Sequence, residues 1–382
     1  MDSRAYVSQF STDGSLFIAA FQGSHIRIYN VEKGWKVHKD ILTKSLRWTV
    51  TDTSLSPVSR ESSFVYIPIW KGIMTPFLQV FANMSPIVHI VDVGSGATES
   101  HANVTMLVFL HGIHDGLDFS TAEDGGYSFG MFSVKFSTDG RELVAGSSDD
   151  SIYVYDLEAN RGSLLTVAHT SDVNTVCFAD ERGDDNLCKV WDRRCFIGRD
   201  KAAGVLVGHL EGVTFIDTRG DGRYFISNGK DQTIKLWDIR KMSATPPHAK
   251  NYEWDYRCME YPPESINLKH PFDQSVSTYK GQSVLRTLIR CYFSPLHRSV
   301  FSSSITTGSN DSSVYIYDLV SGDKVVVLKH HSSPIRDCTW HPHYPTIKSS
   351  SWDGDLVKWE FPGSGEAPIM SNKRVRRRHF YY

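Results

Sequence analysis

The stretch Gly208–Arg240 reads GHLEGVTFIDTRGDGRYFISNGKDQTIKLWDIR and decides the fold. Three runs rich in β-branched and aromatic residues lie within it, at Val213–Ile216, Tyr224–Ile226 and Ile234–Asp238. Gly, Asp and Asn, the residues that favour tight turns, separate these runs. The stretch therefore predicts a unit of three short strands joined by turns.

The same pattern recurs six more times along the 382 residues. The closing strands of these copies are expected at Ile26–Asn30, Val88–Asp92, Ile152–Asp156, Leu187–Asp192, Val314–Asp318 and Leu356–Glu360. Repeats of roughly 40 residues with this composition are typical of four-stranded propeller blades. One such unit cannot bury both of its faces, whereas a ring of units can, and the ring also removes long exposed sheet edges. The sequence thus predicts an all-β fold, a seven-bladed β-propeller.

Four polar or aromatic residues of the fifth unit, His209, Ser227, Asp231 and Trp237, fall where WD-repeat proteins carry a hydrogen-bond relay, and the repeat resembles that family. A buried aspartate at a tight turn needs donors, which a histidine and backbone amides supply. Asp149, Asp184, Asp311 and Asp353 are predicted at the matching position of other units. The alternative, a catalytic His/Asp/Ser set, is disfavoured because the set repeats, whereas a nucleophilic site would be singular.

The fourth unit departs from the pattern because it is short. Eight residues separate Phe178 from Leu187, whereas eighteen separate Phe215 from Ile234 in the fifth unit. About one strand and one turn are expected to be missing, so we predict a truncated fourth blade that arose by a splice or gene-model deletion. Ring closure is left open, because the last unit ends at its third strand and no obvious fourth strand follows.

Residues 1–361 are predicted to form the propeller, with two irregular segments. The segment 58–83 is apolar and reads as an insert: a plug, a partner-binding loop or translated non-coding sequence, of which we favour the last. A long connection covers 241–275. Residues 362–382 are predicted to be a flexible basic tail, whose cluster Lys373–Arg378 suits a nuclear-import signal, a nucleic-acid patch or a solvated tail.

The bulk composition excludes several classes of function. A net charge of -2 gives no global attraction to nucleic acid or to anionic membrane. The six cysteines are scattered and the N-terminus lacks a signal peptide, so nucleus or cytoplasm is the expected compartment. No metal-ligand spacing, phosphate-binding loop or nucleophile elbow occurs. We therefore expect no cofactor, no metal and no enzymatic activity.

Two units end in a Trp-Asp pair that an arginine follows after one residue: Trp237, Asp238 and Arg240 in the fifth unit, and Trp191, Asp192 and Arg194 in the fourth. Both arginines leave the same end of a third strand, so we expect them on one face of the disc. A guanidinium binds carboxylates in a bidentate manner and stays charged, which suits docking of an acidic partner. The alternative is a surface salt bridge to a neighbouring blade.

The surrounding sequence resembles one group of WD-repeat proteins. LRWTVTDTSLSP, SVKFSTDGRELVAGSSDDSIYVYDLEAN, NLCKVWDRRCF and YFISNGKDQTIKLWDIRKM are similar to plant LEC14B-type proteins and to animal DDB-and-cullin-associated factors. The resemblance implies a substrate receptor of a cullin-RING ubiquitin ligase, which binds the damaged-DNA-binding (DDB) adaptor and presents an unknown protein substrate. It implies that Trp191, Asp192, Arg194, Trp237, Asp238 and Arg240 form the docking site. The alternative is a WD-repeat scaffold of a chromatin or RNA-processing complex without a ligase.

Overall fold

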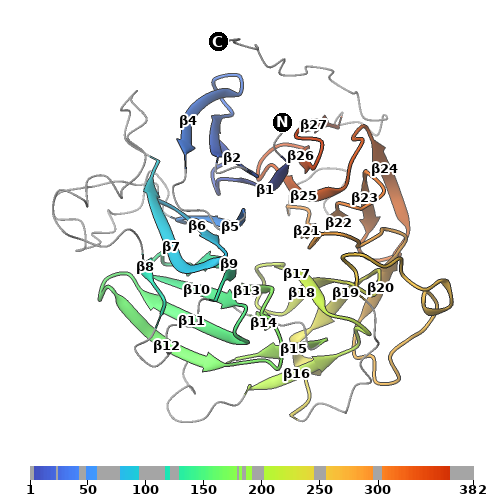
Figure 1. Cartoon of the computed structure of the whole chain (residues 1–382). Helices are drawn as coiled ribbons and strands as arrows, with labels where there is room; N and C mark the ends of the chain where they lie inside the picture. The colour runs from blue at the N-terminus through green and yellow to red at the C-terminus, as the bar shows by residue number, and fades with distance from the viewer. Residues whose placement is uncertain are drawn as a thin grey trace.

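Seven antiparallel sheets surround a common centre in the computed structural model (Figure 1). It describes residues 4–22, 25–42, 49–57, 78–93, 117–120, 129–178, 180–182, 186–191, 202–244, 255–295 and 303–361. The first strand of each sheet lies nearest the centre and the last strand lies at the rim (Figure 1). This is the all-β propeller that the repeats predict.

The first three sheets each contain four strands that follow chain order. Their strands are β1 (Ala5–Phe10), β2 (Leu16–Phe21), β3 (His25–Asn30) and β4 (Lys36–Leu42); β5 (Val50–Leu55), β6 (Leu78–Asn83), β7 (Ser85–Asp92) and β8 (Leu117–Asp118); and β9 (Met131–Phe136), β10 (Glu142–Ser147), β11 (Ser151–Asp156) and β12 (Arg161–Val167).

The remaining sheets follow the same order, and two short 3₁₀ helices lie in the long connection of the fifth sheet. Their strands and helices are β13 (Thr175–Cys177), β14 (Asp180–Arg182), β15 (Leu187–Val190) and β16 (Gly204–Val207); β17 (Val213–Thr218), β18 (Tyr224–Gly229), β19 (Thr233–Asp238), η2 (Ile239–Lys241), η3 (Pro263–Ser265) and β20 (Ser277–Lys280); β21 (Cys291–Phe293), β22 (Ser304–Thr307), β23 (Ser313–Asp318) and β24 (Lys324–Lys329); and β25 (Ile335–Trp340), β26 (Thr346–Ser351) and β27 (Leu356–Glu360).

The blade count differs from the prediction. Six of the sheets are complete four-stranded blades, whereas the sheet β25–β27 has three strands within the described residues. The structure therefore shows six complete blades rather than seven, and the residues that follow Phe361 lie outside the described part of the chain.

Two predictions about the irregular units need correction. The fourth sheet keeps a second strand, β14, so the predicted loss of a whole strand is wrong; the deficit instead shortens β13 and β14 to three residues each. The insert predicted over 58–83 is also too long, because Leu78–Asn83 is strand β6 and pairs with both β5 and β7. A run of apolar residues signals an inner blade strand as readily as an insert. Residues 58–77 lie outside the described residues.

The core is divided into separate layers, each between two neighbouring sheets. Buried side chains of the fifth and sixth sheets share one layer that includes Ile226, Tyr279 and Tyr317. Equivalent layers join each of the other neighbouring pairs, and Leu356 of β27 packs against the layer of the first sheet that contains Phe17. The apolar faces of each blade are thus covered by its neighbours. This removes apolar surface from water and so stabilises the fold. No helix in the described part of the chain is long and apolar enough to cross a membrane.

Candidate functional site

The fifth blade brings together His209, Ser227, Asp231 and Trp237, the four residues predicted to form a relay. His209 Nδ1 lies 3.0 Å from Asp231 Oδ2, and His209 Nε2 lies 2.7 Å from Ser227 Oγ. The indole Nε1 of Trp237 donates to the same Ser227 oxygen at 2.7 Å. The chain of contacts links the turn after β18 to the end of β19, and all four residues are buried.

Asp231 is stabilised as a carboxylate by its surroundings. Burial alone would raise the pKa of Asp231, but the charge and hydrogen bond of His209 and the hydroxyl of Thr233 lower it below its ordinary value. The backbone amides of Leu210 and Thr233 also donate to its oxygens, at 3.0 and 3.1 Å. Because these groups form hydrogen bonds with one another inside the blade, we interpret the set as a structural hydrogen-bond network and not as a catalytic centre.

A second relay, in the last sheet, was missed by sequence reasoning apart from Asp353. His331 Nδ1 lies 3.0 Å from Asp353 Oδ2, while His331 Nε2 and Trp359 Nε1 both reach Ser349 Oγ at 2.9 Å. His331 precedes Asp353 by 22 residues, the same separation as His209 and Asp231. That spacing is the signal that could have identified it.

In two other blades, a tyrosine hydroxyl donates a hydrogen bond to the aspartate that corresponds to Asp231. The hydroxyl of Tyr153 donates to Asp149 at 2.5 Å, and that of Tyr315 donates to Asp311 at 2.6 Å. In the fourth unit the predicted match, Asp184, is off by one residue. The residue that follows each matching aspartate has a left-handed backbone, and in this unit that residue is Asn186, with φ 64°. Asp185 is therefore the equivalent residue, although both aspartates lie outside the described residues.

At the end of β19, Asp238 holds two arginines. Arg240 contacts it through Nε at 3.2 Å and Nη2 at 3.1 Å, and Arg223 donates through Nη2 at 2.8 Å. The side chain of Asp238 is 7% exposed, whereas that of Arg240 is 63% exposed. One carboxylate facing two guanidinium groups leaves a local positive charge at the surface. For Arg240, the ion pair is with an aspartate of its own blade and not, as the alternative predicted, with a neighbouring blade.

The fourth and fifth blades, which carry the two Trp-Asp-x-Arg sequences, are neighbours. A shared core layer contains Cys188 of β15 and Trp237 of β19, and a β-bridge joins Val205 to Ser243. Trp191 follows β15 directly and packs against the layer shared by the third and fourth blades. Asp192 and Arg194 lie outside the described residues, so the structure places only Arg240 of the two predicted docking arginines.

Sequence reasoning missed a buried ionic network between the first strands of several blades. Arg290, next to β21, donates to Asp52 of β5 at 2.9 Å and lies 3.5 Å from Asp337 of β25. The side chains of both aspartates are fully buried. Arg336 crosses from β25 to the carbonyl oxygens of Tyr6 and Thr51, at 2.5 and 3.1 Å. A charged residue in the first strand of a blade, such as Asp52 in VTDTSL or Asp337 in IRDCTW, was the available signal.

In this network the basic side chains stabilise the charge of Asp52, whereas the like charge of Arg290 disfavours that of Arg336. Burial would raise the pKa of Asp52, but Arg290 and Lys135 lower it to about 2. Burial and the neighbouring charge of Arg290 lower the pKa of Arg336 to about 10. A group of buried charges held this way fixes the relative positions of non-adjacent blades. In the described residues no cluster of His, Cys, Asp or Glu has the arrangement of a metal site.

Comparison with known proteins identifies the repeat and the family. The WD domain, G-beta repeat family matches residues 123–156, 201–238 and 322–360. LEC14B protein of Lithospermum erythrorhizon is 62% identical over 99% of this chain and 77% of its own length, and the LEC14B homolog of Prunus armeniaca is 61% identical over 98% and 76%. A Caenorhabditis elegans protein named DDB1- and CUL4-associated factor 11 homolog is 35% identical over 96% of this chain and 62% of its own length. A WD-repeat propeller is a non-enzymatic interaction scaffold, and this chain belongs to the LEC14B family of WD-repeat proteins.

Proposed function

We propose that this chain is a substrate receptor of a cullin-RING ubiquitin ligase, and that it docks on the DDB-type adaptor through the face that carries Arg240. The similarity to the Caenorhabditis elegans DDB1- and CUL4-associated factor 11 homolog supports the role. The observation that carries the docking mode is the exposed Arg240 held against the buried Asp238. A guanidinium that is already oriented loses little freedom when an acidic partner binds it.

The charge balance at this position favours an acidic partner. Arg223 and Arg240 share the single carboxylate of Asp238. Arg194 follows the Trp-Asp pair of the neighbouring blade in the sequence, and we expect it to add a second arginine to the docking site. Since exposed charges gain little from a pair within their own chain, the interaction energy is available to a partner that desolvates the site.

Affinity capture from cells followed by mass spectrometry tests this proposal. We expect the adaptor and a cullin to co-purify with the wild-type chain, and we expect Arg194→Ala combined with Arg240→Ala to reduce both. Arg257→Ala is the matched control, because Arg257 pairs with an aspartate two residues earlier, as Arg240 does, but is part of the long connection. Capture of histones or ribonucleoprotein without a cullin would instead support a chromatin or RNA-processing scaffold.

We further propose that β25–β27 is the seventh blade of one ring. The hydroxyls of Ser8 and Ser350 are 3.2 Å apart, and the backbone amide of Ser8 donates to Asp337 at 2.8 Å, so the first and last sheets are in contact. Side chains this close should allow a disulfide when both serines become cysteine. We expect Ser8→Cys with Ser350→Cys to form a cross-link seen as faster migration on a non-reducing gel. Failure to cross-link under oxidising conditions, in a folded variant, would contradict the ring.

A further inference from the structure

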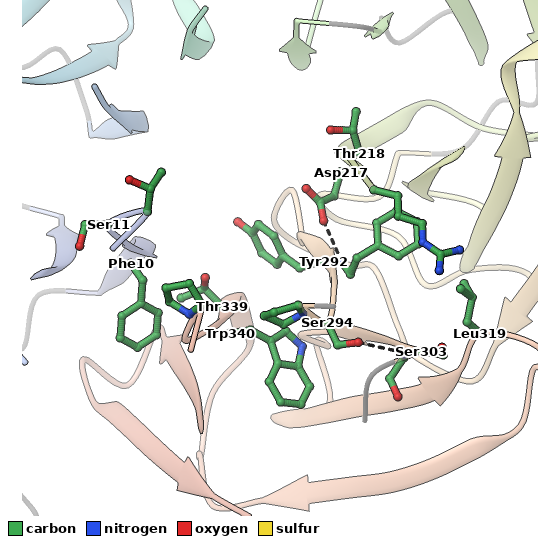
Figure 2. Close-up of a pocket in the computed structure, with 16 residues that line it drawn as sticks. Phe10, Ser11, Asp217, Thr218, Tyr292, Ser294, Ser303, Leu319, Thr339 and Trp340 are labelled. Carbon is green, nitrogen blue, oxygen red and sulfur yellow. Dashed lines mark hydrogen bonds between the residues drawn. The ribbon is translucent and has the colours of Figure 1, made fainter. Parts of the chain in front are cut away.

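A cavity of about 390 Å³ opens where the inner strands of four blades end (Figure 2). Its walls come mainly from β1, β17, β21 and β25 and from the turns that follow them, with Ser304 of β22 and Leu319 after β23 completing the lining. The size lies in the range of pockets that hold a side chain or a small ligand. Because β17 and β19 run in the same direction within the fifth blade, the cavity opens on the same face as Arg240.

The acidic group of this cavity is Asp217, near the end of β17. One oxygen, Oδ2, accepts the backbone N–H of Phe293 at 2.8 Å (Figure 2). Among the described residues, no lysine, arginine or histidine forms an ion pair with it. Burial raises the pKa of Asp217 to about 7, and the Phe293 hydrogen bond and the more distant Lys135 only partly oppose that rise. A carboxylate in such surroundings gains from a cation that enters beside it.

Aromatic residues form much of the rest of the cavity wall. Tyr292, Trp340 and Phe10 line it (Figure 2). The polar ends of two of these residues are already bound, since Tyr292 donates its hydroxyl to Asp337 at 2.8 Å and Trp340 donates its indole N–H to Thr306 at 2.8 Å. These bonds hold two of the rings in place. Each ring also packs against a neighbouring aromatic residue, Tyr292 against Phe215 and Trp340 against Phe361, so only part of each ring faces the cavity. Aromatic surface next to a carboxylate suits the apolar stem and charged head of a basic side chain.

We propose that this cavity binds the side chain of an arginine or lysine presented by a protein partner. The carboxylate of Asp217 pairs with the cationic head, and the aromatic wall packs against the stem. Arg219 also lines the cavity. Its positive charge repels a bound cation and therefore weakens the binding of the ligand. The proposal concerns a different set of residues from the Arg240 site and does not depend on the ligase role.

A small probe tests the cavity directly. N-acetyl-arginine N-methylamide is titrated into the full chain and followed by ligand-observed NMR, with the citrulline analogue as the uncharged isostere. We expect the arginine probe to bind about ten-fold or more tightly than the citrulline probe, because a charged pair in a partly buried site is worth that much. Asp217→Asn should abolish the difference, whereas Arg219→Gln should strengthen binding of the arginine probe.

Two controls keep the test decisive. Asp221→Asn changes an aspartate of the same turn that does not line the cavity, and it should leave binding of both probes unchanged. The side-chain amide oxygen that Asp217→Asn introduces can still accept the Phe293 N–H, so the thermal unfolding of this variant should stay cooperative. Equal binding of the two probes to the wild-type chain, no binding of either, or an unchanged preference in Asp217→Asn would overturn the proposal.

Discussion

At the residue scale, Ser227 connects the two ends of the relay in the fifth blade. Its hydroxyl contacts His209 at 2.7 Å and receives the Trp237 indole N–H at 2.7 Å. Ser349 does the same for His331 and Trp359 in the last sheet. Each serine therefore satisfies two buried polar groups that would otherwise be left without their hydrogen bond.

Replacing either serine with alanine should destabilise its blade. We expect Ser227→Ala and Ser349→Ala each to lower the free energy of unfolding by about 1–3 kcal/mol, since a buried donor loses its acceptor. Ser163→Ala is the control, because, among the described residues, that exposed serine bonds only a backbone carbonyl. Urea denaturation measures the effect, and a loss no larger than in the control would show that the relay contributes little.

At the element scale, the first two strands of the fourth blade form the shortest such pair among the described residues. Strands β13 and β14 are three residues long, whereas β17 and β18 of the next blade are six. Short strands make few ladder hydrogen bonds, so local opening costs less free energy.

Amide hydrogen exchange should reveal this difference. We expect the amides of Thr175–Cys177 to exchange at least ~10-fold faster than those of Val213–Thr218, because the local opening free energy is smaller. Mass spectrometry of peptic peptides from the two blades gives the comparison within one sample. Equal protection in the two strands would mean that the shortened blade is held as firmly as a full one.

The strands of the fifth unit could be predicted closely from sequence, and the irregular ones could not. Its Gly and Asp turns mark each end, so the runs at 213, 224 and 234 coincide with β17, β18 and β19. Strand β6 resembles part of an insert because the residues before it are as apolar as the strand itself, although Pro76 is a breaker signal that could have marked its start. Strand β14 escapes prediction because DER has no strand propensity of its own, and pairing with β13 and β15 imposes its extended backbone.

The candidate site was predictable in part. Local spacing identifies the relay and the arginine after Trp-Asp, since both depend on positions within one blade. The buried ionic network around Asp52 and the cavity beside Asp217, in contrast, depend on which blades lie next to one another in the folded chain. Arg290 and Asp52, for example, are 238 residues apart, and no pattern in one blade reveals their contact.

At the scale of the whole molecule, Asp52 links blades that are distant in the chain. It accepts from Arg290 at 2.9 Å, from Lys135 Nζ at 3.3 Å and from the backbone amide of Val134 at 3.0 Å. If the charge of Asp52 is removed, the buried guanidinium of Arg290 keeps only Asp337 as an acidic partner among the described residues. The stability of the ring therefore depends on this carboxylate more than on a surface ion pair.

We expect Asp52→Asn to lower the unfolding free energy by about 3–5 kcal/mol at pH 7. The pKa of Asp52 is about 2 in the folded chain and 3.8 as an ordinary aspartate, so the folded state holds its proton less tightly. Its contribution is complete above about pH 4 and is lost as the pH falls towards 2. The difference between variant and wild type in urea should thus narrow below pH 4. A difference that is constant from pH 7 to pH 3 would contradict the charged network.

The central claim is that the Trp-Asp-x-Arg face binds the ligase adaptor, and a titration with purified adaptor tests it most directly. Truncating a well-packed interface arginine costs about 2 kcal/mol of binding free energy, so Arg240→Ala should raise the dissociation constant by about 30-fold. Arg257→Ala, the control with the same local ion pair, should stay within about two-fold of wild type. An Arg240→Ala chain that binds the adaptor as tightly as wild type would contradict the account.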